Sequence, residues 1–375
     1  MTRPILIIAG ESSGDNVGGL LCSELKKQSP ALPIFGIGGD RMKLSGVDLL
    51  FHTSQLSFLG FWEVLKHLPF IKRVERDILE RVKHEKPALA ILIDYPGFNL
   101  RMAAKLKGLG VPVVYYVSPQ VWAWGKGRIE KIKQLVDKMV VVFEFEQEMY
   151  KREGMAAEWF GHPLLEIVRS NKNREEFFKE IGLPLGDRYI GLFPGSRKQE
   201  IEKILPVMRD ASQGLSDPSI ISIVACAPGI DDSFYRQLGG DDLKYIRNNT
   251  YELMTHSELN LVASGTATLE CAILGRPQFV LYKTSPITYH IARNLIKIPY
   301  IGLVNVVAGE KIAPEFIQGE CNSRTIKAEI ERFLVDETYH NRLISNLSAV
   351  RDKLGDPGAS RKTAELVLGM VAKQG

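Results

Sequence analysis

The strongest constraint on the fold is a series of short, uninterrupted apolar runs spaced as in alternating strands and helices. In the first half of the chain they cover residues 5–9, 34–37, 88–93, 113–117 and 139–143. Helical stretches such as 17–27 and 74–84 lie between them. Continuous apolar runs are typical of parallel strands with helices on both faces, because neither side of such a strand meets water. The pattern predicts a doubly wound α/β sheet.

A second series follows a polar, charge-rich piece at 169–180, and it covers 189–193, 220–225, 259–263 and 278–282. A chain of 375 residues is also too long for one hydrophobic core. We therefore predict two Rossmann-like doubly wound domains, 1–168 and 169–344, facing across a cleft. A last helix over about 345–375 has no strand after it. It is expected to pack on the first domain or on a partner chain, and the second case would give a homodimer.

The composition argues against several classes of protein. The 48 Lys and Arg residues against 44 Asp and Glu give a net charge of only +4, which is no basis for nucleic-acid binding. The four cysteines are far apart, as expected of reduced, buried thiols; they are Cys22, Cys226, Cys271 and Cys321. No run of about 18 apolar residues is present, and the N-terminal apolar run is too short for a signal peptide. A cytoplasmic protein is expected.

Ligands of open α/β sheets bind beyond the carboxyl ends of the strands, so the turn after each strand is the first place to search. The turn after the first strand reads Gly-Glu-Ser-Ser-Gly-Asp, at 10–15. Its glycines allow close backbone approach, and Glu11 and Ser13 are candidates to hydrogen-bond a sugar acceptor. The alternative is a well-made turn with a helix cap. The turn lacks both the dinucleotide-binding and the P-loop patterns.

Asp94 ends the run 88–93 and is followed by a Pro-Gly turn. A carboxylate at a strand tip suits a general base, although an Asp that caps the next helix is the alternative.

The next loop, 115–125, is rich in aromatic residues. They could form a wall that binds sugar or acyl groups, or they could be ordinary core residues. We place Gln120 of this loop in the donor site. His162 is a weaker candidate, because a lone histidine is usually structural.

The second half of the chain carries two turns suited to phosphate. The first is Gly195-Ser196-Arg197, in which a guanidinium can bind phosphate oxygens in bidentate fashion. The second turn, Ser264-Gly265-Thr266, begins a helix with small hydroxyl residues and a glycine, which suit an anion. Glu270 follows inside this helix and is placed to reach a ribose hydroxyl. Capped helices are the alternative. No paired-Asp motif is present, so we expect a reaction without a metal or a bound cofactor.

Taken in order, these motifs resemble the lipid-A-disaccharide synthase family along nearly the whole chain; they are AGESSGD (9–15), DYPGFN (94–99), YVSPQVWAW (116–124), GHP (161–163), PGSR (194–197) and ASGTATLE (263–270). The resemblance implies the two-domain glycosyltransferase fold called GT-B, with an acceptor-binding first domain and a nucleotide-sugar-binding second domain. It implies transfer of 2,3-diacylglucosamine from UDP to the 6-hydroxyl of 2,3-diacylglucosamine 1-phosphate, with inversion and release of UDP.

Carried over by position, the resemblance makes Asp94 the proposed general base and Arg197 the essential arginine, and it places Asn305 in the nucleotide region. The family often has a second Asp where this chain has Gly97. Acylated substrates also need an apolar surface to bind, and the stretch 56–71, followed by Lys72, Arg73 and Arg76, offers one. The residues expected to contact the membrane are Phe58, Phe61, Trp62, Leu65 and Phe70. Peripheral contact with the inner membrane is expected there. An amphipathic helix facing the core is the alternative.

Three rival functions remain open from the sequence, and the first is a different GT-B transferase with the same cleft and nucleotide site. A UDP-sugar 2-epimerase would share the nucleotide site but would not need the apolar stretch. A non-catalytic nucleotide-binding module would keep Arg197 and Glu270 but would not need Asp94. The sequence does not fix the acyl chain length or the oligomeric state. It also leaves open whether Asp94 takes a proton or positions the acceptor.

Overall fold

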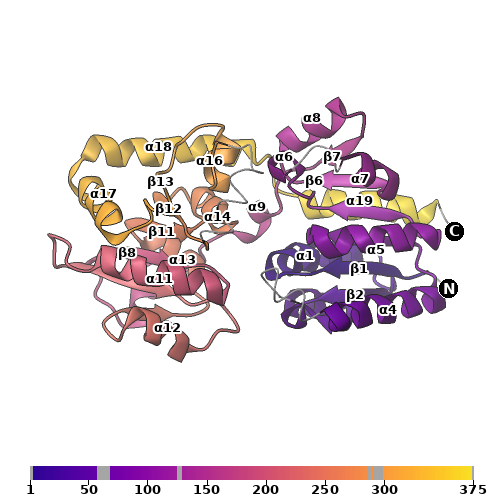
Figure 1. Ribbon diagram of the computed structural model, residues 1–375, viewed down its shortest axis with the longest axis horizontal. Helices are drawn as coiled ribbons and strands as arrows, with labels where there is room; N and C mark the ends of the chain where they lie inside the picture. The colour runs from indigo at the N-terminus through magenta and orange to yellow at the C-terminus, as the bar shows by residue number, and fades with distance from the viewer. Residues whose placement is uncertain (1–2, 57–67, 125–128, 286–288, 290–298, 374–375) are drawn as a thin grey trace. The chain divides into compact units, whose positions relative to one another are not determined.

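The computed structural model describes residues 3–56, 68–124, 129–285, 289 and 299–373, and the chain forms two compact units. Residues 1–166 together with 354–375 form the first unit, and residues 167–353 form the second. Within the described ranges, no helix has both the length and the apolar character needed to cross a bilayer. Figure 1 gives the positions of the elements within each unit.

The first unit is built on a seven-stranded parallel sheet in the order β3-β2-β1-β4-β5-β6-β7. Its strands are β1 (Ile5–Ala9), β2 (Ile34–Gly38), β3 (Asp48–His52), β4 (Leu89–Ile93), β5 (Val113–Tyr116), β6 (Lys138–Val141) and β7 (Ala157–Trp159). The connecting helices are α1 (Ser12–Gln28), α2 (Asp40–Leu44), the 3-10 turn η1 (Thr53–Gln55), α4 (Leu68–Glu85), α5 (Pro96–Gly108), α6 (Val121–Trp124), α7 (Ile129–Leu135), α8 (Glu144–Arg152) and α9 (Leu164–Ile167).

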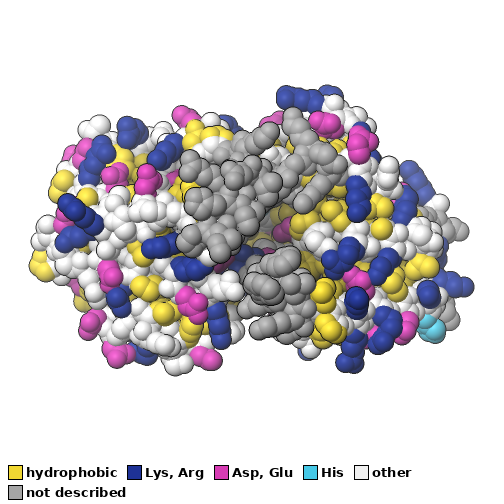
Figure 2. Space-filling view, in the orientation of Figure 1, with side chains coloured by type: hydrophobic (Ala, Val, Ile, Leu, Met, Phe, Trp, Pro, Cys, Tyr) yellow, Lys and Arg dark blue, Asp and Glu magenta, His cyan; other side chains and the backbone are white. Residues whose placement is uncertain are grey.

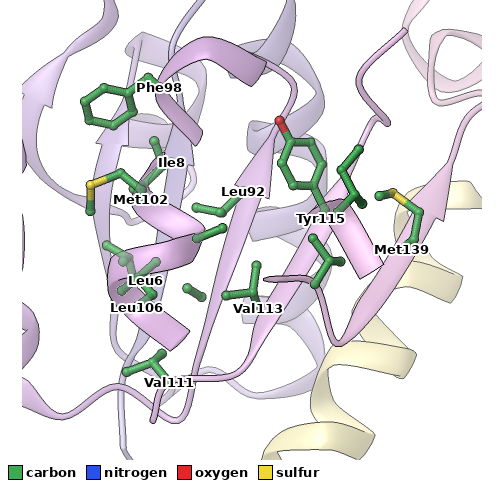
Figure 3. Close-up of a cluster of buried hydrophobic side chains, with 14 of the residues drawn as sticks. Leu6, Ile8, Leu92, Phe98, Met102, Leu106, Val111, Val113, Tyr115 and Met139 are labelled. Atoms are coloured by element: carbon green, nitrogen blue, oxygen red, sulfur yellow. The ribbon is translucent and has the colours of Figure 1, made fainter. Parts of the chain in front are cut away.

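One face of this sheet packs against α4, α5 and α7 through a continuous apolar cluster, part of which is drawn in Figure 3. Leu6, Leu92 and Val113 come from three neighbouring strands and are fully buried. Met102 and Leu106 of α5 cover them. Burying such side chains contributes roughly 1.5–3 kcal/mol each relative to exposure. The core therefore fixes the strand ends from which the functional turns emerge.

The second unit has a six-stranded parallel sheet in the order β10-β9-β8-β11-β12-β13. Its strands are β8 (Arg188–Phe193), β9 (Ile220–Ala225), β10 (Lys244–Ile246), β11 (Leu259–Ala263), β12 (Gln278–Tyr282) and β13 (Glu315–Ile317). Its helices are α10 (Arg174–Ile181), α11 (Lys198–Ser212), α12 (Asp232–Gly239), α13 (Thr250–His256), α14 (Ala267–Ile273), α16 (Leu303–Ala308), α17 (Ser323–Val335) and α18 (Glu337–Lys353).

Alternate residues of β8 belong to two separate apolar clusters on the two faces of this sheet. Ile190 and Leu192 pack with helices α11, α12 and α17, whereas Tyr189 and Phe193 pack with α10, α13 and α14. Both faces are thus covered, as the continuous apolar runs require. The prediction of two doubly wound parallel α/β units is confirmed.

The single helix expected over 345–375 is wrong, because the chain breaks between α18 and α19 (Ala359–Ala372). Gly355 and Gly358 in the break have φ angles of 79° and 107°, which residues other than glycine rarely adopt. A side chain at Gly355 would also meet Trp159, 2.9 Å from Cζ2. After the break, α19 packs against α1 of the first unit, where Figure 1 shows it in yellow.

In both sheets the strand order reverses next to the first strand of the unit. This switch point lies between β1 and β4 in the first unit and between β8 and β11 in the second. Loops leave a switch point in opposite directions, so the carboxyl ends of these two strands are where ligands of doubly wound sheets bind.

Candidate active site

The turns that follow β1 and β4 lie together at the switch point of the first unit. Ala9 pairs with Ile93 in the sheet, so Gly10 and Asp94 follow at the same edge. The Tyr95 ring lies over Gly10, where an added Cβ would fall 2.7 Å from Cε1 and closer still to two other ring atoms. Burial, and then the charge of Glu11, raise the pKa of Tyr95. The two turns therefore form one packed surface.

Glu11 and Ser13 begin the helix α1 at this surface. Glu11 occupies the N-cap position, Ser13 lies in the first turn, and both are half-buried. Asp15, the last residue of the same motif, has a structural role. It is 6% exposed, and its carboxylate accepts the backbone N–H groups of Gly39 at 2.6 Å, Arg41 at 3.0 Å and Met42 at 3.1 Å. It therefore fixes the turn after β2 rather than contacting a ligand.

Asp94 lies one residue beyond β4, in the left-handed region at φ 47°, and is half-buried. Its backbone N–H donates to the Tyr116 carbonyl of β5 at 3.0 Å. Its carbonyl accepts from the Tyr115 hydroxyl at 2.6 Å and from Asn99 Nδ2 at 2.8 Å. The carboxylate thus sits on a backbone held from both sides, as a catalytic group requires.

A row of aromatic rings extends from the β5 loop to the exit of β7. The centroids of Trp122 and Phe145 lie 5.6 Å apart, those of Phe145 and Phe143 5.2 Å apart, and those of Phe143 and His162 5.2 Å apart. Trp122 and Phe145 are half-buried, so this row is partly core and partly surface. Gln120, just before α6, is exposed.

Two ionisable groups, His162 in this row and Glu146 beside it, have pKa values shifted toward the neutral form. Burial raises the pKa of Glu146 to about 7, with hydrogen bonds from Trp122, Phe143 and Val142 opposing the shift and the charge of Asp94 adding to it. Burial lowers the pKa of His162 to about 3, and its Nδ1 accepts the N–H of Leu164 at 3.1 Å. His162 is therefore neutral at physiological pH and has a packing role.

In the second unit the turns after β8 and β11 are neighbours, since Phe193 pairs with Val262. Gly195 has a φ of 109°, and an added Cβ would lie 2.5 Å from Oε2 of Glu200. Arg197 donates from Nη1 to Oε1 of the same Glu200 at 3.1 Å. Glycine is thus required at 195 both by its conformation and by the carboxylate that orients Arg197. Ser196, between them, is exposed.

The second turn divides into a half-buried anchor and an exposed tip. The Ser264 hydroxyl donates to the Ile301 carbonyl at 3.0 Å, so this side chain ties two loops together. Gly265 and Thr266 are exposed, and an added Cβ at Gly265 would meet no protein atom within 4 Å. Burial raises the pKa of the Glu270 carboxyl on α14 to about 7. A ligand at this turn would meet open backbone first.

Asn305, which the resemblance places in the nucleotide region, makes internal hydrogen bonds in this structure. The residue is 0% exposed, and both polar atoms of its side-chain amide, Nδ2 and Oδ1, are hydrogen-bonded within the second unit. Nδ2 donates to Ala313 O and to Glu315 Oε1, both at 2.8 Å, and Oδ1 accepts from the N–H groups of Ile312 and Ala313, both at 2.9 Å. Glu315 also accepts from the N–H of Gly302 at 2.8 Å. Asn305 therefore holds the loop between α16 and β13.

The expected membrane-facing residues fall mostly outside the described part of the chain. Phe58, Phe61, Trp62 and Leu65 lie in the segment 57–67. Phe70 is half-buried and packs against the apolar core, with its ring edge-on to Phe51 at 6.2 Å.

Nearly the whole chain, including these turns, matches one protein family. The model of the lipid-A-disaccharide synthetase family matches residues 5–364. Lipid-A-disaccharide synthase of Geobacter sulfurreducens is 41% identical, covering 99% of this chain and 98% of the relative. The proteins of the same name from Syntrophus aciditrophicus and Myxococcus xanthus are 40% and 38% identical over 99% and 98% of this chain, covering 99% and 98% of their own length.

Solved structures of lower identity share the fold. UDP-GlcNAc 2-epimerase from Neisseria meningitidis, bound to UDP-GlcNAc, is 12% identical with a TM-score of 0.69, covering 98% of this chain and all of that one. The calicheamicin glycosyltransferase CalG4 is 13% identical with a TM-score of 0.60, covering 100% and 99%. The full-length sequence match, rather than the shared fold, assigns the family: this chain belongs to the lipid-A-disaccharide synthetases.

Proposed function

We propose that this chain is the glycosyltransferase that joins UDP-2,3-diacylglucosamine to 2,3-diacylglucosamine 1-phosphate in lipid A biosynthesis. The observation that carries the proposal is the chemistry at the two switch points. One carries a carboxylate, Asp94, beside the Gly10 turn. The other carries Arg197 and the open backbone of Gly265. A base and a diphosphate site are the two parts that glycosyl transfer from UDP requires.

In the proposed reaction the 6-hydroxyl oxygen of the acceptor attacks the anomeric carbon of the donor. As this C–O bond forms, the hydroxyl proton passes to the Asp94 carboxylate, and the bond from the anomeric carbon to the diphosphate breaks. The electron pair of that bond leaves with UDP. Attack from the face opposite the leaving group inverts the anomeric centre. Glu11 and Ser13 are proposed to hold the acceptor.

We assign the leaving group to the second unit. Arg197 and the Ser196 backbone would bind the developing diphosphate charge, while Gly265 and Thr266 would contact it through exposed backbone. Because Glu200 holds Arg197 at 3.1 Å, the guanidinium is oriented before the donor arrives. Such preorganised charge is usually the largest catalytic term. Glu270 is proposed to accept from a ribose hydroxyl, and exposed Gln120 is proposed as a further donor contact.

The test is UDP release on mixing the protein with both acylated substrates and then omitting each in turn. UDP and a phosphorylated disaccharide should appear only when both are present. Asp94→Asn should lower the turnover number at least 100-fold, on the order of the loss expected for a general base, while UDP still binds. If UDP forms with the donor alone, the transferase proposal is wrong. Unchanged turnover in Asp94→Asn would remove Asp94 from the base role only.

We also propose that the first unit touches an anionic lipid surface next to α4. Leu68 is 37% exposed, and Lys72 and Arg73 on the next turn are exposed. Figure 2 shows Lys and Arg side chains gathered over the face where α4 and α5 lie. Cations near an apolar segment are attracted to anionic headgroups. Co-sedimentation with phosphatidylglycerol vesicles should fall in Phe61→Ser/Trp62→Ser, and unchanged binding would end this proposal.

A further inference from the structure

We propose that Tyr115 and Asn99 are positioning residues that hold the main chain of Asp94 in the one conformation that aims its carboxylate. The inference rests on the proposed role of Asp94 in the reaction. Neither residue is expected to touch substrate. Both act through a single atom, the carbonyl oxygen of Asp94.

The backbone at this position is strained. Asp94 and Tyr95 both have φ angles of 47°, so two consecutive residues with side chains lie in the left-handed region. That region costs roughly 1 kcal/mol or more for each residue other than glycine. A strained segment of this kind persists only where its surroundings hold it. The neighbours of Asp94 must therefore supply the restraint.

The restraint is a pair of donors on one carbonyl. Tyr115 Oη lies 2.6 Å and Asn99 Nδ2 lies 2.8 Å from Asp94 O. Nδ2 also donates to Ile93 O at 3.0 Å, so one amide group spans the carbonyls of two consecutive residues. Two donors from β5 and α5 fix the direction of the peptide group after Asp94, and with it the direction of the Cα–Cβ bond.

The amide of Asn99 is kept in this orientation at a cost. The residue is 0% exposed, and its Oδ1 has no hydrogen-bond partner among the residues that the structure describes. A buried acceptor without a partner costs about 1–3 kcal/mol. Turning the amide over would place Oδ1 against the two carbonyls and is worse. The arrangement is thus built to present donors to Asp94 and Ile93.

The hydroxyl of Tyr115 bonds Asp94, whereas the hydroxyl of the next residue, Tyr116, does not. Both Tyr115 and Tyr116 are buried on β5, but successive side chains of a strand point to opposite faces. The Tyr116 hydroxyl lies beside Ser360 and Thr363 of α19. In Figure 3 the Tyr115 hydroxyl projects beyond the apolar cluster that contains its ring. Removing either hydroxyl deletes one buried oxygen, but only Tyr115 loses a bond to Asp94.

The experiment compares Tyr115→Phe with Tyr116→Phe as a matched control. Loss of the Tyr115 bond should let the strained peptide relax and turn the carboxylate away. A displacement of about 1 Å can cost a factor of about 100 in rate. We expect kcat to fall by about 10- to 100-fold in Tyr115→Phe, with the acceptor KM and the UDP affinity unchanged. Tyr116→Phe should keep kcat within about twofold of wild type at a similar melting temperature.

The double variant separates positioning from general stability. If Tyr115 acts through Asp94 alone, Tyr115→Phe should add no loss to the residual rate of Asp94→Asn. Asn99→Ala, which removes the other donor, should also lower kcat with little change in KM. Should one of the two single variants fail to fold, the other decides.

The proposal is overturned if the folded Tyr115→Phe and Asn99→Ala proteins have the kcat of Tyr116→Phe. It is equally overturned if Tyr115→Phe and Asp94→Asn lower the rate independently. These outcomes are distinct from failure of the proposed base, which shows as an active Asp94→Asn protein with all other residues intact.

Discussion

The indole Nε1 of Trp122 lies 3.1 Å from Oε1 of Glu146, a residue that is 1% exposed. The other oxygen of this carboxyl group accepts the backbone N–H groups of Val142 and Phe143 at 3.3 Å and 3.2 Å. Glu146 thus ties the short helix α6 to the start of α8, and with them the aromatic row that includes Trp122 and Phe145.

Glu146 should make stability depend on pH. Burial raises its pKa from 4.5 in the unfolded chain to about 7. Between these values the folded protein binds more protons than the unfolded one, so the free energy of unfolding falls as pH rises from about 4.5 to about 7 and then levels off. The contribution of Glu146 to the unfolding free energy is about 3 kcal/mol below pH 4.5 and is lost by about pH 7. Denaturant unfolding at several pH values should show this slope, and Glu146→Gln should reduce it.

Glu144→Gln is the matched control, because Glu144 is exposed on the same helix. It should leave the slope of the unfolding free energy unchanged. A slope that survives intact in Glu146→Gln would show that Glu146 is ionised in the folded protein across this range.

Gly10→Ala should disrupt the surface between the β1 and β4 turns. The new methyl group would occupy the space of the Tyr95 ring, which must move and release its 3.1 Å hydrogen bond to Leu56 O. We expect a loss of about 1–3 kcal/mol in unfolding free energy. We also expect kcat to fall by more than it does in the control variant Gly97→Ala. Gly97→Ala meets no atom within 4 Å and lies in the first turn of α5. It should be neutral or stabilise by about 0.5–1 kcal/mol. Equal effects of the two substitutions on activity would contradict this account.

Much of the fold was predictable because long central strands are apolar on both faces. Four strands are not predicted by the apolar runs, because they are short or lie at sheet edges: β3, β7, β10 and β13. Strand β10 has three residues, one of them an exposed lysine, and so carries little apolar signal. Gly355, Pro357 and Gly358 indicate the break after α18. The sequence nevertheless predicts one helix, because helical periodicity continues on either side of these residues.

Only the site residues that directly follow an apolar run could be predicted from the sequence. Asp94 and Arg197 follow apolar runs, and the structure places both turns at switch points. The residues that hold them gave no such signal. Tyr115 reaches Asp94 across 21 residues because β4 and β5 pair, and a pairing cannot be read from either segment alone. Asn305 shows the same limit, because a motif position does not distinguish a ligand contact from a buried hydrogen-bonding residue.

Asn305→Ala should lower stability more than it alters ligand contacts. It would leave two backbone N–H groups, one carbonyl and part of the Glu315 carboxylate without their present partners. We expect a loss of about 3 kcal/mol or more in unfolding free energy, since each unmet buried group costs about 1–3 kcal/mol. Thermal denaturation with and without UDP tests this. A protein of wild-type stability that no longer binds UDP would instead show Asn305 to be a direct contact.

Gly265→Ala should report how closely the donor approaches the second unit. The added methyl group meets no protein atom within 4 Å, so stability should change by less than about 0.5 kcal/mol. If diphosphate contacts this backbone, UDP affinity should still fall by about 10-fold or more. Gly195→Ala, in contrast, should lower both stability and affinity because its φ is 109° and Glu200 lies in the way. Unchanged UDP affinity in Gly265→Ala would place the diphosphate elsewhere.

Glu270 should make donor binding depend on pH. Burial raises the pKa of its carboxyl to about 7. A ribose hydroxyl donates best to the ionised form, so binding should lower this pKa and release a proton near neutral pH. Affinity for a UDP-sugar should therefore rise with pH up to about 7, by at most about 10-fold per pH unit, and then level off. Calorimetry in buffers of different ionisation enthalpy measures both quantities. Glu270→Gln should bind more weakly above pH 7 and without this dependence. If proton release is unchanged in Glu270→Gln, the ribose is not held by this carboxylate, because its titration would then be independent of the bound nucleotide.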